Sequence, residues 1–188
     1  MAARRGVTRK QLVDAALAVL DAENRIEAVR LGAVAKRLGI RSQSLYAHVE
    51  GVAGLRRLLA LWTLEELTQV VMGAAVGRSG RDAVEAILRA NLAFAIKHPG
   101  RFEASLHPPG NDRELAIAVE RAGHPLQSVL TSLGLDTEQR IHWIRLQLSL
   151  IVGFTTLVQN GRLTLAPNPL TTVDHVVATL LDRLDLCS

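Results

Sequence analysis

Cysteine, aromatic residues and long apolar runs are all scarce in this chain of 188 residues. The single cysteine, Cys187, excludes an internal disulfide bond and a zinc site built from cysteines. The longest apolar candidate, residues 143–158, is interrupted by Arg145 and Gln147, and we expect it to be too short for the ~20 residues of a membrane span. A secretory signal is not expected either, because Asp14 interrupts the first apolar segment. These absences predict a cytoplasmic protein that has no membrane partner.

Charge is distributed unevenly along the sequence. Hydrophobic residues make up 48% of the chain and charged residues 21%, which is too apolar for a disordered protein. Residues 1–57 contain 11 Lys and Arg but only 5 Asp and Glu, whereas the remainder contains 11 and 13. A basic head on a slightly acidic body favours binding of a polyanion by the head, although a merely solvated basic face would have the same composition.

Helical periodicity runs through almost the whole sequence, and alternating strand patterns and repeats are absent. Thr8 and Gln11 have the spacing of a capping box at the start of the first helix. The fold class is therefore predicted to be all-α with about nine helices. After the first helix, we expect the others near residues 32–38, 42–48, 52 onward, 82–97, 101–106, 112–133 (kinked or broken near Gly123 and Pro125), 138–159 and 171–186.

Residues 31–50, LGAVAKRLGIRSQSLYAHVE, predict two short helices that cross at a steep angle. Ala35 offers a small contact point and Gly39 a residue suited to the tight turn. The second helix would present short or hydrogen-bonding side chains that suit base edges and phosphates in a major groove. An ordinary helical hairpin remains the alternative. Arg41 and Gln43 are the best candidates for reading bases, because arginine can bind guanine and glutamine can bind adenine through two hydrogen bonds.

Three segments of the sequence resemble the tetracycline-repressor (TetR) family of transcriptional regulators. They are VAKRLGIRSQSLYAHV at 34–49, GLRRLLA at 54–60 and, more weakly, GFTTLVQNGRLTL at 153–165. The resemblance covers about residues 8–60. It implies a helix-turn-helix DNA-binding domain at 1–51 and a ligand-binding and dimerisation domain at 52–188. It also implies a homodimer, built on the last two long helices, that binds a palindromic operator in double-stranded DNA and most often acts as a repressor.

The resemblance also implies roles for single residues in DNA binding. The Tyr46 hydroxyl would meet a phosphate while its ring packs on the first helix, and His48 would contact the DNA backbone. Two positions depart from the family pattern: Arg30 precedes the second helix in place of a Ser or Thr cap, and Val52 replaces a lysine. A free backbone amide near Gly32 would then bind a phosphate in place of the missing cap. The side chain of Arg56, or an N-terminal arm with Arg4 and Arg5, would replace the contact of the missing lysine. The predicted DNA-binding residues are Arg4, Arg5, Arg30, Gly32, Arg41, Ser42, Gln43, Ser44, Tyr46 and His48.

The body of the chain carries candidates for an effector site and for a dimer interface. Most of the aromatic residues lie on helices that would enclose a cavity for an unknown, largely apolar small molecule, although each could be simple core. The ligand-binding candidates are Trp62, Phe94, Phe102, His107, Trp143 and Phe154. The helix at 138–159 has two apolar faces, which predicts pairing with a second copy. The interface candidates are Ile144, Leu148, Ile151, Val177 and Leu181.

No motif supports an enzyme, a cofactor or a metal site. Glu103 and His107 have a spacing that a metal could use, but Pro108 ends that helix, so a role in the loop is favoured. The leading hypothesis is a homodimeric, ligand-responsive transcriptional regulator that acts as a repressor. Two alternatives stay open: an all-α enzyme or small-molecule-binding protein that keeps the hairpin as a scaffold, and a dimeric module whose basic head binds acidic proteins or membrane surfaces.

Overall fold

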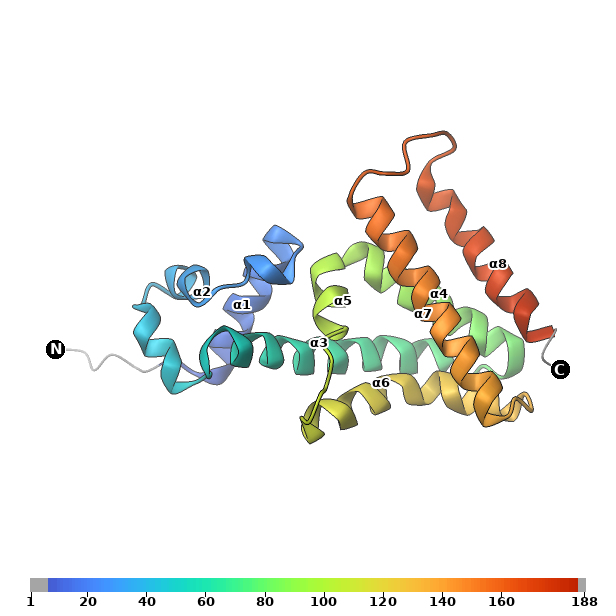
Figure 1. Ribbon diagram of the computed structural model, residues 1–188, viewed down its shortest axis with the longest axis horizontal. Helices are drawn as coiled ribbons and strands as arrows, with labels where there is room; N and C mark the ends of the chain where they lie inside the picture. The colour runs from blue at the N-terminus through green and yellow to red at the C-terminus, as the bar shows by residue number, and fades with distance from the viewer. Residues whose placement is uncertain (1–6, 186–188) are drawn as a thin grey trace. The chain divides into compact units, whose positions relative to one another are not determined.

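The computed structural model describes residues 7–185, and every regular element in that range is helical. Eight α-helices and three 3-10 segments follow one another along the chain, and the described residues contain no strand (Figure 1). The all-α prediction is therefore confirmed. Arg4, Arg5 and Cys187 lie outside the described residues.

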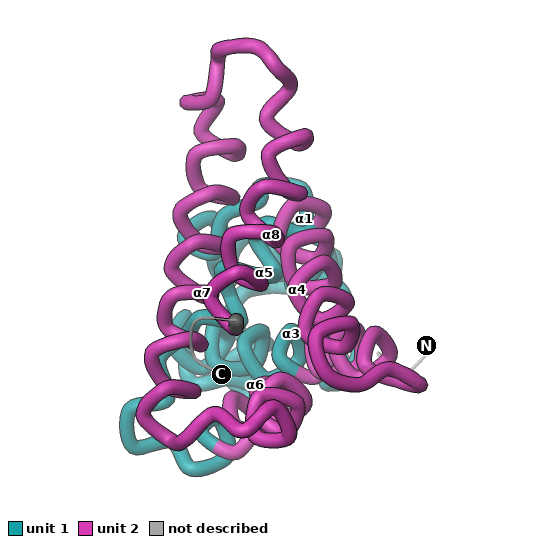
Figure 2. Tube along the Cα trace, turned by 90° about the vertical axis from the view of Figure 1, so that its right-hand side faces the viewer, with its two compact units in different colours: residues 1–64, 98–116 teal, residues 65–97, 117–188 magenta. Residues whose placement is uncertain are grey.

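The chain divides into two compact units, coloured separately in Figure 2. Unit 1 comprises residues 1–64 and 98–116, and unit 2 comprises residues 65–97 and 117–188. These boundaries describe packing, and they fall inside two helices. The functional division between residues 51 and 52 remains a prediction.

Unit 1 begins as the sequence predicts. The side chains of Thr8 and Gln11 form the reciprocal capping box at the start of α1. At the end of α2, Gly39 adopts a φ of 67°, a left-handed conformation that costs glycine little. The elements of this unit are α1 (Arg9–Glu23), η1 (Ile26–Ala28), α2 (Leu31–Leu38), η2 (Ser42–Ala47), α5 (Pro99–Ser105) and the first part of α3 (Gly51–Ala75).

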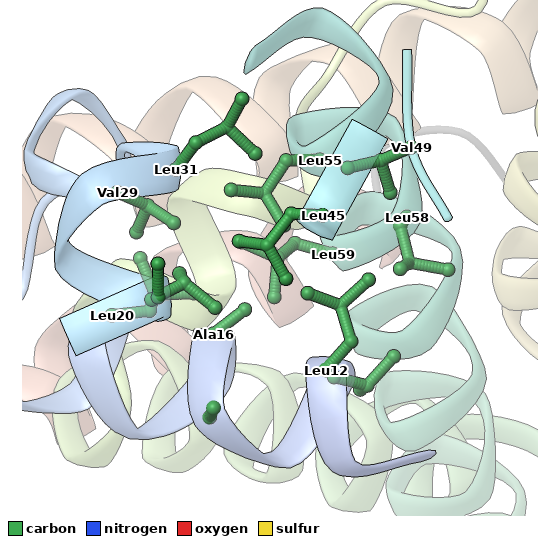
Figure 3. Packing of buried hydrophobic residues seen from close by; sticks show 14 of the residues in the cluster. Leu12, Ala16, Leu20, Val29, Leu31, Leu45, Val49, Leu55, Leu58 and Leu59 are labelled. Atoms are coloured by element: carbon green, nitrogen blue, oxygen red, sulfur yellow. The ribbon is translucent and has the colours of Figure 1, made fainter. Parts of the chain in front are cut away.

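One cluster of aliphatic side chains holds the head of unit 1 together (Figure 3). Leu12 and Leu20 of α1 meet Leu45 of η2 and Leu55 and Leu59 of α3, and all five are fully buried. Each such side chain contributes roughly 1.5–3 kcal/mol when it is removed from water. This packing fixes η2 against α1 and α3, so the direction of its outward side chains is set by the core.

The segment after Gly39 differs from the sequence expectation. A helix from Ser42 to His48, capped by Ser42, was predicted, but the structure has a 3-10 helix over Ser42–Ala47. Arg41 stands at the cap position, and no side chain caps the first amides of η2. The 3-10 winding of these six residues places Leu45 in the core.

Unit 2 is a helical group in which α4, α7 and α8 contact one another pairwise. Its elements are α4 (Gly80–Lys97), α7 (Thr137–Gln159), η3 (Pro169–Thr171), α8 (Thr172–Asp185), the end of α3 and most of α6 (Arg113–Ser132). Helix α6 continues through Pro125, so the break that glycine and proline predicted there is not present. At its start, α7 has a capping box between Asp136 and Gln139.

Helix α7 is long and apolar, and it begins one residue before the predicted range 138–159. A window of 18 residues within it has a mean hydropathy of 1.4, so by length and composition the helix could cross a bilayer, which corrects the expectation that residues 143–158 are too short. Only 28% of that window is buried. One face of α7 packs against α4 and α8 in unit 2. Apolar side chains on the rest of the helix are exposed, and no described residue covers them.

Candidate nucleic-acid interface

The outward face of η2 consists almost entirely of hydrogen-bonding side chains. Leu45 and Val49 are buried with 0% and 8% of their surface exposed, and they turn the intervening residues toward solvent. The exposed residues are Arg41, Ser42, Gln43, Ser44, Tyr46 and His48. The structure therefore brings these six DNA-binding candidates onto one solvent-exposed segment.

Tyr46 is more exposed than the sequence comparison implied. Its ring was expected to pack on the first helix, but 62% of the residue is exposed. The neighbouring Leu45 occupies the inward position instead. The phenol hydroxyl therefore stands in solvent, where it can donate a hydrogen bond to a phosphate oxygen.

The start of α2 offers backbone amides in place of a capping side chain. Arg30 occupies the cap position and makes no side-chain cap bond, as the missing Ser or Thr predicted. Gly32 in the first turn is exposed, and a Cβ added there would meet no atom within 4 Å. Unpaired amides at a helix N-terminus bind phosphate well, so this end of α2 suits the DNA backbone.

Three exposed cations of the head were not selected from the sequence. Lys36 and Arg37 end α2, and Arg9 begins α1. Arg9 also lines a cleft of about 270 Å³ together with His48, Glu50, Gly54 and Arg57. The sequence signal for them was the Lys-Arg pair in the last turn of α2. A cation at this position can reach a phosphate beside the groove.

Arg57 joins the beginning of α3 to the residues that begin α6. Its guanidinium donates through Nε and Nη2 to the Asp112 carboxylate, with Nη2–Oδ1 at 3.0 Å, and Nη2 also reaches Oε2 of Glu114 at 2.6 Å. Asp112 accepts the backbone N–H of Leu115 as well. Mainly because of the hydrogen bond from Arg57, the pKa of Asp112 falls from 3.8 to about 2. The ion pair thus holds the helix that follows η2.

The ion pair between Arg57 and Asp112 makes the free energy of unfolding depend on pH in the acidic range. The native pKa of Asp112 lies below its unfolded value, so the stabilisation is complete above pH 4 or so and is lost as the pH falls through about 2. We expect Asp112→Asn to lower the melting temperature at pH 7, and the difference from wild type to shrink toward pH 2. Thermal unfolding by circular dichroism across this range checks the prediction, and Asp14→Asn, at an exposed i,i+4 pair, is the control. A difference that stays constant down to pH 2 would contradict it.

Helix α5 packs with the head inside unit 1. Glu103 Oε2 accepts the N–H of Ile26 at 2.8 Å, and Arg101 forms a two-pronged ion pair with Asp21 at 2.7 and 2.6 Å. Gly100 lies so close to the end of α1 that an added Cβ would be 3.0 Å from the backbone of Asn24. Glu103 therefore holds η1, and not the loop after α5 in which the sequence predicted its role.

Comparison with known proteins shows which family the chain belongs to. The family described as "Tetracyclin repressor-like, C-terminal domain" matches residues 84–180. The helix-turn-helix-type transcriptional regulator YobS of Bacillus subtilis is 30% identical over 185 residues, which are 98% of this chain and 96% of YobS. The chain belongs to the TetR family of transcriptional regulators. Proteins of this family regulate transcription.

Two further similarities agree with this assignment. The helix-turn-helix-type regulator Rv0681 of Mycobacterium tuberculosis is 32% identical over 157 residues, covering 82% of this TetR-family chain and 72% of Rv0681. The regulator FadR of Bacillus subtilis, solved in complex with stearoyl-CoA, has the same fold with a TM-score of 0.68. That match has 13% sequence identity and covers 94% of this chain and 99% of FadR.

The effector candidates of this TetR-family chain have different environments. In unit 1, Phe102 is buried, His107 is half-buried, and Trp62 on α3 is 44% exposed. In unit 2, Phe94 and Trp143 are buried, and Phe154 is 8% exposed. Trp143 lines a surface cleft of about 400 Å³, and Phe154 lines a different one of about 630 Å³.

The dimer candidates separate into two groups. Three of them, Ile151, Val177 and Leu181, are buried in the core of unit 2, so the prediction that they lie in a dimer interface is wrong. Leu148 is 41% exposed and Ile144 is half-buried, so both can meet a partner. The helix packs Ile151 inward because its stripe faces α4 and α8.

Proposed function

We propose that this TetR-family regulator binds a palindromic operator as a homodimer and represses transcription until an effector binds. The observation that carries the proposal is the exposed polar face of η2, held in place by the buried Leu45 and Val49. Direct reading of bases requires side chains on a rigid element that fits the major groove, and this face meets that requirement. Such a protein works in the cytoplasm, where bacterial DNA lies.

Roles within the interface follow from position and chemistry. Arg41 and Gln43 are assigned to base edges, since each can form two hydrogen bonds with one base. Phosphate contacts are assigned to Ser42, Ser44, Tyr46, His48, the amide of Gly32 and the side chain of Arg30, with Arg4 and Arg5 as an arm. Lys36, Arg37 and Arg9 add positive charge around them.

A homodimer is supported by the uncovered face of α7. Two exposed apolar stripes flank its buried face: Leu148, 41% exposed, lies with the half-buried Ile144 on one stripe. Leu146 and Leu157, 38% and 44% exposed, lie with Leu150 and Gly153 on the other stripe. Near the end of this stripe, a groove of about 630 Å³ is lined mainly by apolar residues of α7, α8 and the connection between them. A surface of this kind is stabilised when a second copy covers it. Dimerisation would place two heads on successive major grooves, about 34–36 Å apart.

An apolar effector is supported by the interior of unit 2. Its buried residues are aliphatic or aromatic apart from three uncharged polar ones, and none of the described buried residues is charged. FadR of Bacillus subtilis, which has this fold, binds stearoyl-CoA. An effector would regulate DNA binding only by binding one conformation of the dimer better than another, and operator DNA would then weaken effector binding by the same factor.

The test is a gel shift with DNA from upstream of the protein's own gene, with random DNA as competitor. We expect Arg41→Ala and Gln43→Ala each to reduce operator affinity by ~1–3 kcal/mol while leaving affinity for random DNA nearly unchanged. Lys36→Ala should weaken both DNAs alike and reduce the salt dependence, because it removes a phosphate contact.

The matched control is Arg113→Ala, which removes an exposed arginine from α6 and should leave both affinities unchanged. If the Arg41 and Gln43 variants lost affinity equally for operator and random DNA, their assignment to base edges would be wrong. If the wild-type protein showed no preference for any DNA sequence, the proposed function itself would fail.

A further inference from the structure

A cleft in unit 1 collects basic side chains from three elements of the head. Arg9 comes from the start of α1, His48 from the end of η2 and Arg57 from the second turn of α3. The cleft has a volume of about 270 Å³, and Glu50 is the one acidic residue among the described residues that line it. Two arginines and a histidine around one small cleft favour the binding of an anion.

Two of these side chains are available to an anion. Arg9 and His48 are exposed, and neither side chain forms a hydrogen bond or an ion pair with another described residue. His48 ends the exposed polar face of η2 that is proposed to read DNA, so the cleft lies at one end of that face. The anion that a protein meets beside a recognition element is a phosphate of the DNA backbone.

Arg57 is less exposed than the other two and is held along one edge of its guanidinium. Nε and Nη2 donate to Asp112, and Nη2 also donates to Oε2 of Glu114 at 2.6 Å. These bonds occupy the three N–H groups of that edge, whereas a guanidinium has five. Nη1 bonds to no described residue, so its two N–H groups remain for an anion in the cleft that Arg57 lines.

Asp112 and Glu114 have two opposing effects on the binding of an anion by Arg57. They fix the guanidinium in one orientation, and Asp112 is itself fixed because it accepts the N–H of Leu115 at 3.1 Å. An arginine that is already ordered loses less side-chain entropy when it binds a phosphate. The same carboxylates reduce the positive charge beside the cleft. Removing one of them should therefore change anion affinity little, whereas removing the guanidinium removes the contact itself.

We propose that this cleft is a phosphate site of the DNA interface, in which Arg57 binds the phosphate through Nη1 together with Arg9 and His48. Asp112 and Glu114 act through Arg57 as positioning residues. A phosphate oxygen accepts hydrogen bonds from all three basic side chains, and those from arginine are strengthened by charge. The inference rests on the proposed DNA-binding function, and it gives Arg57 a role in binding beyond the ion pair that supports α3.

The test compares Arg57→Gln with the matched control Arg101→Gln. Arg101 also forms a two-pronged ion pair in unit 1, with Asp21, but it does not line the cleft. Fluorescence anisotropy measures the affinity of the full chain for labelled operator and random duplexes over a range of salt concentrations. We expect Arg57→Gln to weaken both by roughly three- to tenfold and to lower the salt slope by about one per head. Arg101→Gln should bind as wild type does.

Asp112→Asn separates a phosphate contact from a purely structural role of the ion pair. It breaks the same pair but keeps the cation, so the affinity for both duplexes should stay within about twofold of wild type. Equal losses in Arg57→Gln and Asp112→Asn would overturn the assignment, because the pair would then only support α3. Arg9→Gln changes the cleft at an exposed residue outside the ion pair, and it should fold normally and weaken both duplexes as well. Unchanged affinity in Arg9→Gln would also overturn the site.

Inorganic phosphate distinguishes a phosphate of the DNA backbone from a free anion. When phosphate replaces chloride at constant ionic strength, DNA binding by wild type should weaken no more than that by Arg57→Gln. A larger loss in wild type would assign the cleft to free phosphate and overturn its assignment to the DNA backbone. If wild type prefers its operator but Arg57→Gln binds equally well, only this site is wrong. If wild type prefers no DNA sequence, the proposed function is wrong.

Discussion

Replacing Ile151 with glutamate is expected to unfold unit 2. Ile151 has 0% of its surface exposed, and it lies on the face of α7 that packs in the core. A glutamate there would bury an unpaired charge, so we expect the free energy of unfolding to fall by at least about 4 kcal/mol. Urea unfolding followed by circular dichroism measures this loss, which is a large share of the ~5–15 kcal/mol of a typical domain.

Ile151→Val is the matched control for this substitution. It removes one methylene group from the same site and should cost only about 0.5–1.5 kcal/mol. An Ile151→Glu protein with an unfolding midpoint close to that of wild type would show that α7 does not pack through this face. The inward orientation of Ile151 would then be wrong.

Leu148→Glu, on the same helix, is expected to leave the fold intact and to abolish the dimer. Leu148 is 41% exposed, so a glutamate there can remain hydrated in a single chain. Pairing through this face would bury the charge, and the protein should sediment as a monomer at micromolar concentration. Operator affinity should fall by at least about 100-fold, because one head alone makes half of the contacts.

The matched control for the dimer is Val119→Glu, at a site on α6 that is 39% exposed. It introduces the same charge away from α7 and should leave both the dimer and operator binding unchanged. A wild-type protein that sediments as a monomer at micromolar concentration would contradict the homodimer. A Leu148→Glu protein that remains dimeric would place the interface elsewhere.

The local signals of the sequence were sufficient for most helix ends. The capping box of Thr8 and Gln11 starts α1, and Gly39 ends α2, because both depend on side chains and backbone angles within a few residues. Pro125 shows where such local reasoning fails. A proline indicates a kink or a break, yet α6 continues through Pro125, with one backbone hydrogen bond fewer.

The motif of the head was also readable from the sequence, together with the family it indicates. Spacing placed Leu45 inward and Arg41 and Gln43 outward, and the structure has this arrangement. The 3-10 winding of η2 and the exposure of Tyr46 were not readable, since both depend on how the segment packs through Leu45 against α1 and α3.

The sequence by itself determined that the chain is all-helical, that its head is basic, and that it belongs to the TetR family, with residues 31–50 as the predicted DNA-binding hairpin. Only the tertiary structure decided which apolar face of α7 is core and which is free. Ile151 and Leu148 are equally apolar and lie on the same helix, so their difference arises from α4 and α8. The pairing of Arg57 with Asp112 joins residues far apart in the chain. Contacts of this kind leave no local pattern, because they exist only once the helices have packed.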